Sequence, residues 1–280
     1  MLPGEEETRE HIRTEFAGAF ANARDTLELE EQVLDALCEA TNRLDDTSPG
    51  TIIIAALTKL LRQHLAVRLL CERGLTREAE IIARGMFEVV LVVLGLLAQD
   101  FELRCGAPER RPTVGLRAKL VLAKMAIDRE KYARMVEKGT ALVLSTTARQ
   151  NADTWVKDAE SALGPQWIEW VRKHKDYFGL RVGDLAKRLG LDEYYEVIYR
   201  IQSGALHASD LDEFIVSSDE ESNGSHQELE CRLFPDCESA PITLLLARQL
   251  VCVTLLEIDR HFGLELEERI KALSAAQDSA

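Results

Sequence analysis

The sequence predicts an all-α protein, a multi-helix bundle around one central apolar helix. Its 16 glycines and 7 prolines are 23 of 280 residues, below the roughly 12% of average usage, so turn residues are scarce. Apolar residues recur at helical spacing along most of the chain, and no run of strict alternation is bounded by turn residues. Helical periodicity and scarce turns together favour long helices over sheets.

The first 46 residues predict an N-terminal helical extension. Apolar side chains recur at helical spacing between Glu6 and Arg43, which fits one or two amphipathic helices. The turn-forming run at 45–50 then separates this extension from the main domain. We therefore expect the main domain to cover residues 50–280 and to open with a helix over 51–73.

Residues 76–100 predict the central helix of the bundle. Thr76 is suited to cap its start, since a threonine hydroxyl can accept a hydrogen bond from the first turn. The run Val89–Leu94 is apolar on every side, which is typical of a helix buried on every side. Arg84 and Glu88 lie one turn apart on one face. They form either a partly buried ion pair or a pair bonded to neighbouring helices, or else they are part of a binding cavity.

The second half of the chain predicts more helices and one loop. The expected helices cover 114–143, 152–163, 165–177, 180–191, 241–262 and 264–273. Residues 180–191 look like the opening of a DNA-reading helix-turn-helix, but the acidic and aromatic Asp192–Glu196 would repel phosphates. A short helix ended by a glycine is expected there instead, and 209–239 is predicted to be a mobile acidic loop.

Charge narrows the range of partners. The chain carries 34 Lys and Arg against 48 Asp and Glu, a net charge of −14, which disfavours broad electrostatic binding to double-stranded DNA or anionic lipid. A small local basic site remains compatible with this charge. The longest apolar stretch, Val89–Ala98, is shorter than the about 20 residues of a membrane span. With no signal-peptide pattern at the start, a cytoplasmic protein that binds no membrane is expected.

Cysteine, histidine and tryptophan point to no special chemistry by their spacing. The six cysteines and six histidines lack metal-ligand spacing, so we expect no metal. Cys231 and Cys237 are expected to stay reduced in a cytoplasmic protein. Trp155, Trp167 and Trp170 have few basic neighbours in sequence and are interpreted as packing residues rather than a base-stacking platform.

A polar stripe crosses an otherwise apolar helix predicted over 194–207. At about 100° per residue, Glu196, Arg200, Ser203 and His207 would lie within roughly 60° of one another. Such a stripe is either the solvent face of an amphipathic helix or a site. Arginine and histidine suit a site, because the first binds phosphate and the second moves protons near neutral pH.

The spacing of Arg200 and His207 resembles the Arg-x(4–6)-His signature of the HEPN superfamily, whose members are all-α nucleotide-binding domains and often metal-independent ribonucleases. Residues 76–100 with Arg84 and Glu88, together with 195–207, also resemble an uncharacterised bacterial helical family described as a domain of unknown function. That wider resemblance covers roughly residues 50–262.

The HEPN resemblance implies roles for the residues of the stripe. His207 would act as general acid or base on an RNA 2′-hydroxyl or leaving oxygen, and Arg200 would stabilise the phosphorane charge. Arg84, Glu88 and Ser203 would line the same RNA- or nucleotide-binding cavity. The resemblance further implies no metal or other cofactor, a homodimer with the site at its interface, and a role in defence or toxin–antitoxin systems.

Two departures and one alternative accompany this resemblance. Ile201 stands where catalytic members commonly carry a polar residue, and the six-residue gap is the longest that the signature permits. The alternative, from a different functional class, is a non-catalytic helical protein that binds a partner or small ligand, with a purely structural stripe.

Overall fold

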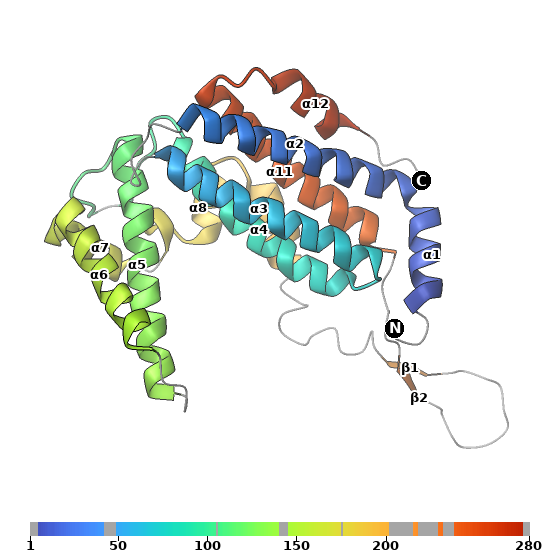
Figure 1. The fold of residues 1–280 in the computed structure, drawn as a ribbon, viewed down its shortest axis with the longest axis horizontal. Coiled ribbons are helices and arrows are strands. Elements are labelled where there is room, and N and C mark those ends of the chain that lie inside the picture. The colour runs from blue at the N-terminus through green and yellow to red at the C-terminus, as the bar shows by residue number, and fades with distance from the viewer. Residues whose placement is uncertain are drawn as a thin grey trace. The chain divides into compact units, whose positions relative to one another are not determined.

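The computed structural model describes residues 5–41, 49–104, 106–139, 145–174, 176–201, 215–217, 229–231 and 238–276. Helices make up almost all of this part of the chain, so the predicted all-α class is confirmed (Figure 1). The chain divides into two compact units. Unit 1 comprises 1–39, 56–90 and 191–280, and unit 2 comprises 40–55 and 91–190.

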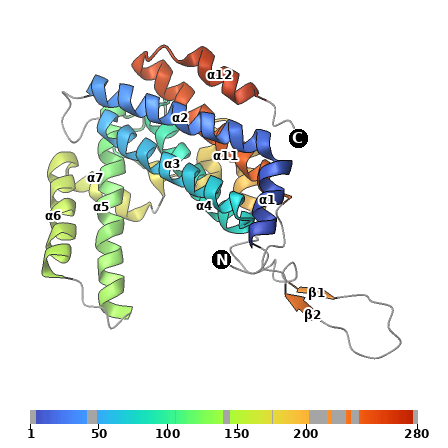
Figure 2. The same ribbon diagram turned by 45° about the vertical axis from the view of Figure 1, so that its right-hand side comes forward.

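Unit 1 contains the long apolar helices. Its elements are α1 (Glu5–Glu15), α2 (Ala17–Thr41), α3 (Pro49–Glu72), α4 (Thr76–Leu97), α9 (Asp192–Tyr194), the π-helix η2 (Tyr195–Ile201), β1 (Ile215–Ser217), β2 (Leu229–Cys231), α11 (Ala240–Phe262) and α12 (Glu267–Ala275). The first two turns of α3 and the last two turns of α4 belong to unit 2. Within unit 1, α2, α3, α4 and α11 lie side by side in both ribbon views (Figures 1 and 2).

The core of unit 1 follows from the apolar faces of these four helices. Fully buried side chains come from each of them, because a stripe of apolar residues at helical spacing removes most surface from water when it meets another. They include Leu29, Val33 and Leu37 of α2, Leu57 and Leu60 of α3, Met86 and Phe87 of α4, and Val251, Leu255 and Ile258 of α11. The predicted central helix is thus a buried helix of the core.

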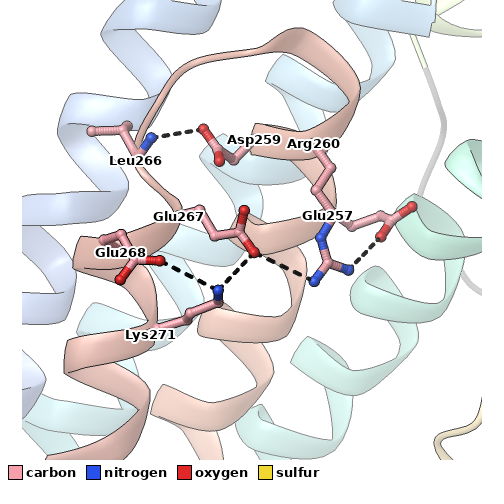
Figure 3. Close-up of polar contacts among 7 residues, drawn as sticks. All are labelled: Glu257, Asp259, Arg260, Leu266, Glu267, Glu268 and Lys271. Carbon is pink, nitrogen blue, oxygen red and sulfur yellow. Dashed lines mark hydrogen bonds and ion pairs between the residues drawn. The ribbon is translucent and has the colours of Figure 1, made fainter.

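The turn between α11 and α12 is fixed by polar contacts, shown in Figure 3. Gly263 ends α11 at a φ of 65°, and the Asp259 carboxylate accepts a hydrogen bond from the Leu266 amide at 2.9 Å. Lys271 contacts Glu267 at 2.9 Å. Arg248, buried on α11, donates to the carbonyl of Ala276 at 2.8 Å. The bonds of Asp259 and Arg248 hold the two ends of α12 against α11, while the contact of Lys271 with Glu267 lies within α12.

Unit 2 is built on α5 (Val114–Gly139). The other elements are α6 (Thr146–Leu163), α7 (Pro165–Lys173), the 3₁₀ turn η1 (Tyr177–Gly179) and α8 (Val182–Arg188). The buried Arg117 donates to the carbonyls of Leu96, Pro112 and Ala98 at 3.1, 3.2 and 2.6 Å. One guanidinium therefore satisfies the carbonyls of Leu96 and Ala98 at the end of α4, which have no partner inside the helix, and also the carbonyl of Pro112 just before α5.

Several predicted boundaries need correction. The helix predicted over 165–177 ends at Lys173, because His174 has an extended backbone. Residue Thr76 starts α4 as predicted, but its buried hydroxyl has no hydrogen-bond partner among the described residues, so the predicted cap is wrong. The short helix expected over 180–191 is confirmed as α8, and Gly190 follows it at a φ of 71°.

The segment predicted as a mobile acidic loop, 209–239, contains a short antiparallel ladder. Ile215 pairs with Cys231, and Ser217 pairs with Leu229. Most of the other residues of the segment lie outside the described part of the chain. The side chain of Cys231 and the whole of Cys237 lie outside it as well, so their expected reduced state stays a prediction.

One described helix, α11, is long and apolar enough to cross a membrane by length and composition alone. The expectation of no span rested on Val89–Ala98 and overlooked this helix. Just over half of its apolar window, 56%, is buried within the structure, and it carries the buried Arg248 and Asp259. Core helices satisfy the same criteria of length and composition, so the expectation of no membrane span stays a prediction.

Candidate functional site

The predicted polar stripe is only partly described. Arg200 lies on η2, while Ser203 and His207 lie outside the described residues. The structure therefore neither brings these residues together nor separates them from Arg84 and Glu88. A π-helix has i→i+5 hydrogen bonds, so the spacing of about 100° per residue assumed for the stripe does not apply across 195–201. Single turns of π-helix occur frequently at functional sites.

Arg84 and Glu88 are placed on α4, within unit 1. Arg84 is half-buried and Glu88 is exposed. Their two predicted roles, as a structural pair bonded to each other or to neighbouring helices and as part of a binding cavity, stay predictions. Beside them, a Cβ on Gly85 would lie 2.8 Å from the side-chain nitrogen of Gln63 on α3. The glycine thus allows close approach of α3 and α4 at Arg84.

Buried polar atoms gather on α3 and α4. The side-chain oxygen of Gln63, the Nε of Arg68 and the hydroxyl of Thr76 are buried without a hydrogen-bond partner among the described residues. An unpaired buried polar group costs about 1–3 kcal/mol, so such a group needs a structural or functional reason. Gln63 and Arg68 lie on α3 and Thr76 lies on α4, the helix that carries Arg84 and Glu88, and none of the three belonged to the predicted site.

A buried acid–imidazole pair lies between α2 and α3. Glu30 Oε2 and His64 Nδ1 are 2.6 Å apart and both side chains are fully buried. Burial raises the pKa of Glu30, and the attraction of His64 opposes that rise. Burial also raises the pKa of the nearby Cys252 thiol to about 11. Sequence reasoning missed this pair, since its partners are 34 positions apart in the chain.

Unit 2 contains a cleft of about 400 Å³ between α5 and α6. The Arg129 guanidinium lies over the Trp155 ring, 4.3 Å from its centroid. Trp155 is 42% exposed, whereas Trp167 and Trp170 are buried. The interpretation as packing residues therefore holds for Trp167 and Trp170 only. The other residues that line the cleft are Lys119, Leu122, Met125, Ala126, Asp158, Ala159, Ala162 and Leu163.

A second, wider depression of about 500 Å³ lies on α5 beside α7. We call it the basic depression, because four cations and one carboxylate line it. Its lining residues are Ile127, Glu130, Lys131, Arg134, Met135, Lys138, Gly139 and Arg172. Glu130 binds Arg134 at 2.7 Å and Arg172 at 3.2 Å, each through a different carboxylate oxygen. The helical spacing of the cations at 131, 134 and 138 could have indicated this site from the sequence. No sequence pattern indicated that Arg172 also lines it.

Charge divides unequally along the chain. Residues 91–190, the main part of unit 2, carry 18 Lys and Arg against 12 Asp and Glu, a net charge of +6. The remaining 180 residues carry 16 against 36, a net charge of −20. The cleft between α5 and α6 and the basic depression both lie in the segment 91–190. The net charge of −14 therefore conceals a basic region that sequence reasoning did not separate.

The described residues contain no cluster suited to a metal ion. Nowhere in this part of the chain do three or more His, Cys, Asp or Glu side chains come together in an arrangement that could hold one.

Comparison with known proteins places the chain in a family. No curated protein and no solved structure matches it. The family of unknown function DUF5677 matches residues 50–223, more than half of the 280 residues. The match contains Arg84, Glu88, Arg200, Ser203 and His207. The chain therefore belongs to the family of unknown function DUF5677.

Proposed function

We propose that this protein is an RNA-binding, HEPN-like ribonuclease that uses Arg200 and His207 and requires no metal. The observation that carries the proposal is the position of Arg200 on η2, a π-helix inside the family match, seven residues before His207. Distorted helical turns of this kind are frequent at functional sites. The basic segment 91–190 supports the RNA-binding half of the proposal, since it removes the objection raised by the net charge.

The proposed chemistry is an internal transesterification of RNA. His207 either takes the proton of a 2′-hydroxyl or gives one to the leaving 5′-oxygen, water takes or gives the other proton, and the 2′-oxygen attacks the adjacent phosphorus. The bond from phosphorus to the 5′-oxygen breaks, which leaves a 2′,3′-cyclic phosphate and a 5′-hydroxyl. Arg200 stabilises the extra negative charge on the phosphorane. We propose that Arg84, Glu88 and Ser203 bind the nucleotide, and that two copies of the chain form the site as a homodimer.

The test is cleavage of a mixed pool of RNAs in the presence of a chelator. We compare wild type with Arg200→Ala and His207→Ala, and use His261→Ala as the matched control because His261 is exposed on α11. The proposal predicts that both site variants lose at least about 100-fold in rate while folded, since positioned acid–base groups contribute typically about 10²–10⁴-fold. Wild type that cuts nothing, or four proteins that cut alike, overturns it.

A second function is favoured by the cleft between α5 and α6. Its volume of about 400 Å³ and its exposed Trp155 and Met125 suit a small apolar ligand. In this alternative the protein is a non-catalytic binding protein and the stripe is structural. A ligand at 100 times its dissociation constant would add about 2.7 kcal/mol to the stability of wild type. Trp155→Ala would abolish that gain if the cleft is the binding site.

A further inference from the structure

We propose that the basic depression on α5 and α7 binds the phosphates of single-stranded RNA. The inference rests on the proposed function and deepens it, because it gives the substrate backbone phosphate contacts in unit 2 in addition to those at the catalytic pair. Four cations line the depression, Lys131, Arg134, Lys138 and Arg172, against the single carboxylate of Glu130. An excess of three positive charges in a depression of this size suits a polyanion.

Glu130 holds the two arginines of the depression in place. It is 8% exposed, and its two oxygens bind Arg134 and Arg172 separately, at 2.7 and 3.2 Å. The arginine side chains nevertheless remain 63% and 43% exposed. A guanidinium carries five N–H donors, so each arginine keeps donors for an anion after it has bound Glu130. Groups fixed before binding lose less conformational entropy when the ligand arrives.

The lysines extend the positive surface along α5. Lys131 and Lys138 are exposed and lie two turns apart, about 10 Å along the helix axis, with Arg134 between them. Such an array fits an extended chain of phosphates better than one isolated anion.

Exposed apolar side chains favour a nucleic acid strand over a simple polyanion. Tyr132 and Met135 of α5 are 63% and 56% exposed. Met135 lines the depression, whereas Tyr132 follows Lys131 in the chain and is not one of its lining residues. An exposed aromatic ring within reach of a basic track can stack an unpaired base, which is worth about 1–3 kcal/mol per base in proteins that bind single strands. The paired bases of a duplex are not available for such stacking. The two features together favour a single strand, and the proposed function makes that strand RNA.

The first experiment measures binding of a labelled RNA of about 12 nucleotides and mixed sequence at several salt concentrations, a length within the range that single-strand binding modules cover. The full chain carries His207→Ala so that the RNA is not consumed. Adding Arg134→Ala and Arg172→Ala is expected to weaken binding at least about tenfold. The slope of log K against log salt should fall by about 1.4, or about 0.7 for each phosphate that is no longer neutralised. The control pair Arg24→Ala and Arg260→Ala removes the same charge from exposed positions in unit 1 and should change binding less than twofold.

A second variant separates positioning from simple electrostatics. Glu130→Gln removes one negative charge, so a purely electrostatic surface would bind RNA more tightly. If Glu130 positions Arg134 and Arg172, the same variant binds severalfold more weakly, because a neutral amide holds only one guanidinium well. Thermal unfolding confirms that the variant is folded. Unchanged or tighter binding by folded Glu130→Gln overturns the positioning of the two arginines.

The outcomes distinguish this site from the catalytic proposal. If cleavage depends on Arg200 and His207, but RNA is bound and cut equally well without Arg134 and Arg172, the RNA site is overturned and the ribonuclease stands. Binding that depends on the two arginines, in a protein that never cuts RNA, supports the RNA site and overturns the ribonuclease. Failure of both the His207→Ala protein and wild type to bind RNA overturns the site.

Discussion

Residues 91–190 and the rest of the chain differ in the sign of their net charge, +6 against −20. Unit 1 buries ionisable side chains such as Glu30, His64 and Arg248 among apolar helices, and its sequence is strongly acidic. Unit 2 presents arginines and lysines around two depressions and pairs several of them with carboxylates. Net charge therefore indicates which partners a protein can bind only when it is counted for each compact unit, because binding depends on the local electrostatic field.

A buried aromatic residue of unit 1 and an exposed one of unit 2 give the largest expected difference in stability. Phe87 on α4 is fully buried in unit 1, whereas Trp155 on α6 is 42% exposed beside the cleft of unit 2. Phe87→Ala should cost about 3–5 kcal/mol, because it leaves a cavity in a packed core. Trp155→Ala should cost less than about 1 kcal/mol. Denaturant unfolding of the two variants measures the difference, and equal costs would contradict the assigned difference in burial between these two side chains.

The buried pair of unit 1 provides the next test. Glu30→Ala leaves His64 buried without its partner and should cost about 3–5 kcal/mol. Glu30→Gln keeps the size and one hydrogen bond, so its cost at acidic pH should be below about 1 kcal/mol. Urea unfolding compares both variants with wild type. If Ala and Gln cost the same, the contact with His64 contributes nothing to stability.

The same pair predicts a pH dependence with a definite sign. Burial raises the pKa of Glu30 above its usual 4.5, so the native state binds more protons there than the unfolded state. The stabilisation is therefore fully present below pH 4.5 and is lost as pH rises through the raised pKa. Glu30→Gln, which never ionises, should gain stability relative to wild type across that range. A difference between the two proteins that stays constant with pH would contradict this assignment.

Unit 2 has a close contact whose disruption should have a smaller effect. A Cβ on Gly95 would lie 2.6 Å from the ring of Phe178, which is itself buried against Phe101 with ring centroids 5.2 Å apart. Gly95→Ala should cost about 1–3 kcal/mol by overpacking. The cost should shrink in a Phe178→Ala background, since the clashing ring is gone. Additive costs in this double-mutant cycle would show that the two residues do not interact.

Much of the fold follows from helical periodicity, and the exceptions have physical causes. The start of α5 at Val114, the end of α6 at Leu163 and the end of α11 at Phe262 were predicted correctly from apolar spacing and flanking glycines and prolines. The end of α7 was predicted four residues too late, because the apolar pattern continues into η1 although the backbone of His174 is extended. Periodicity records which side chains face the core and is insensitive to single backbone dihedrals.

The candidate sites were less accessible to sequence reasoning. The pair of Glu30 and His64 and the contact of Glu130 with Arg172 each join residues far apart in the chain, so no spacing rule could reveal them. The polar stripe assumed α-helical geometry where η2 is a π-helix. The roles of Arg200 and His207 stay predictions, since the described residues leave them untested.

The smallest expected effect concerns the start of α5, which carries much of both depressions. Thr113 caps this helix, with its hydroxyl accepting from the Leu116 amide at 3.2 Å, and Gly115 follows in the first turn. A Cβ at Gly115 would meet nothing within 4 Å, and its φ is not left-handed. Gly115→Ala should therefore stabilise the protein by about 0.4–1 kcal/mol, because alanine restricts the unfolded chain. Gly106→Ala is the matched control, since its φ of 90° should make the same change destabilising although the space is equally open. If both variants shift the unfolding midpoint in the same direction, backbone conformation does not decide the sign at these two glycines of unit 2.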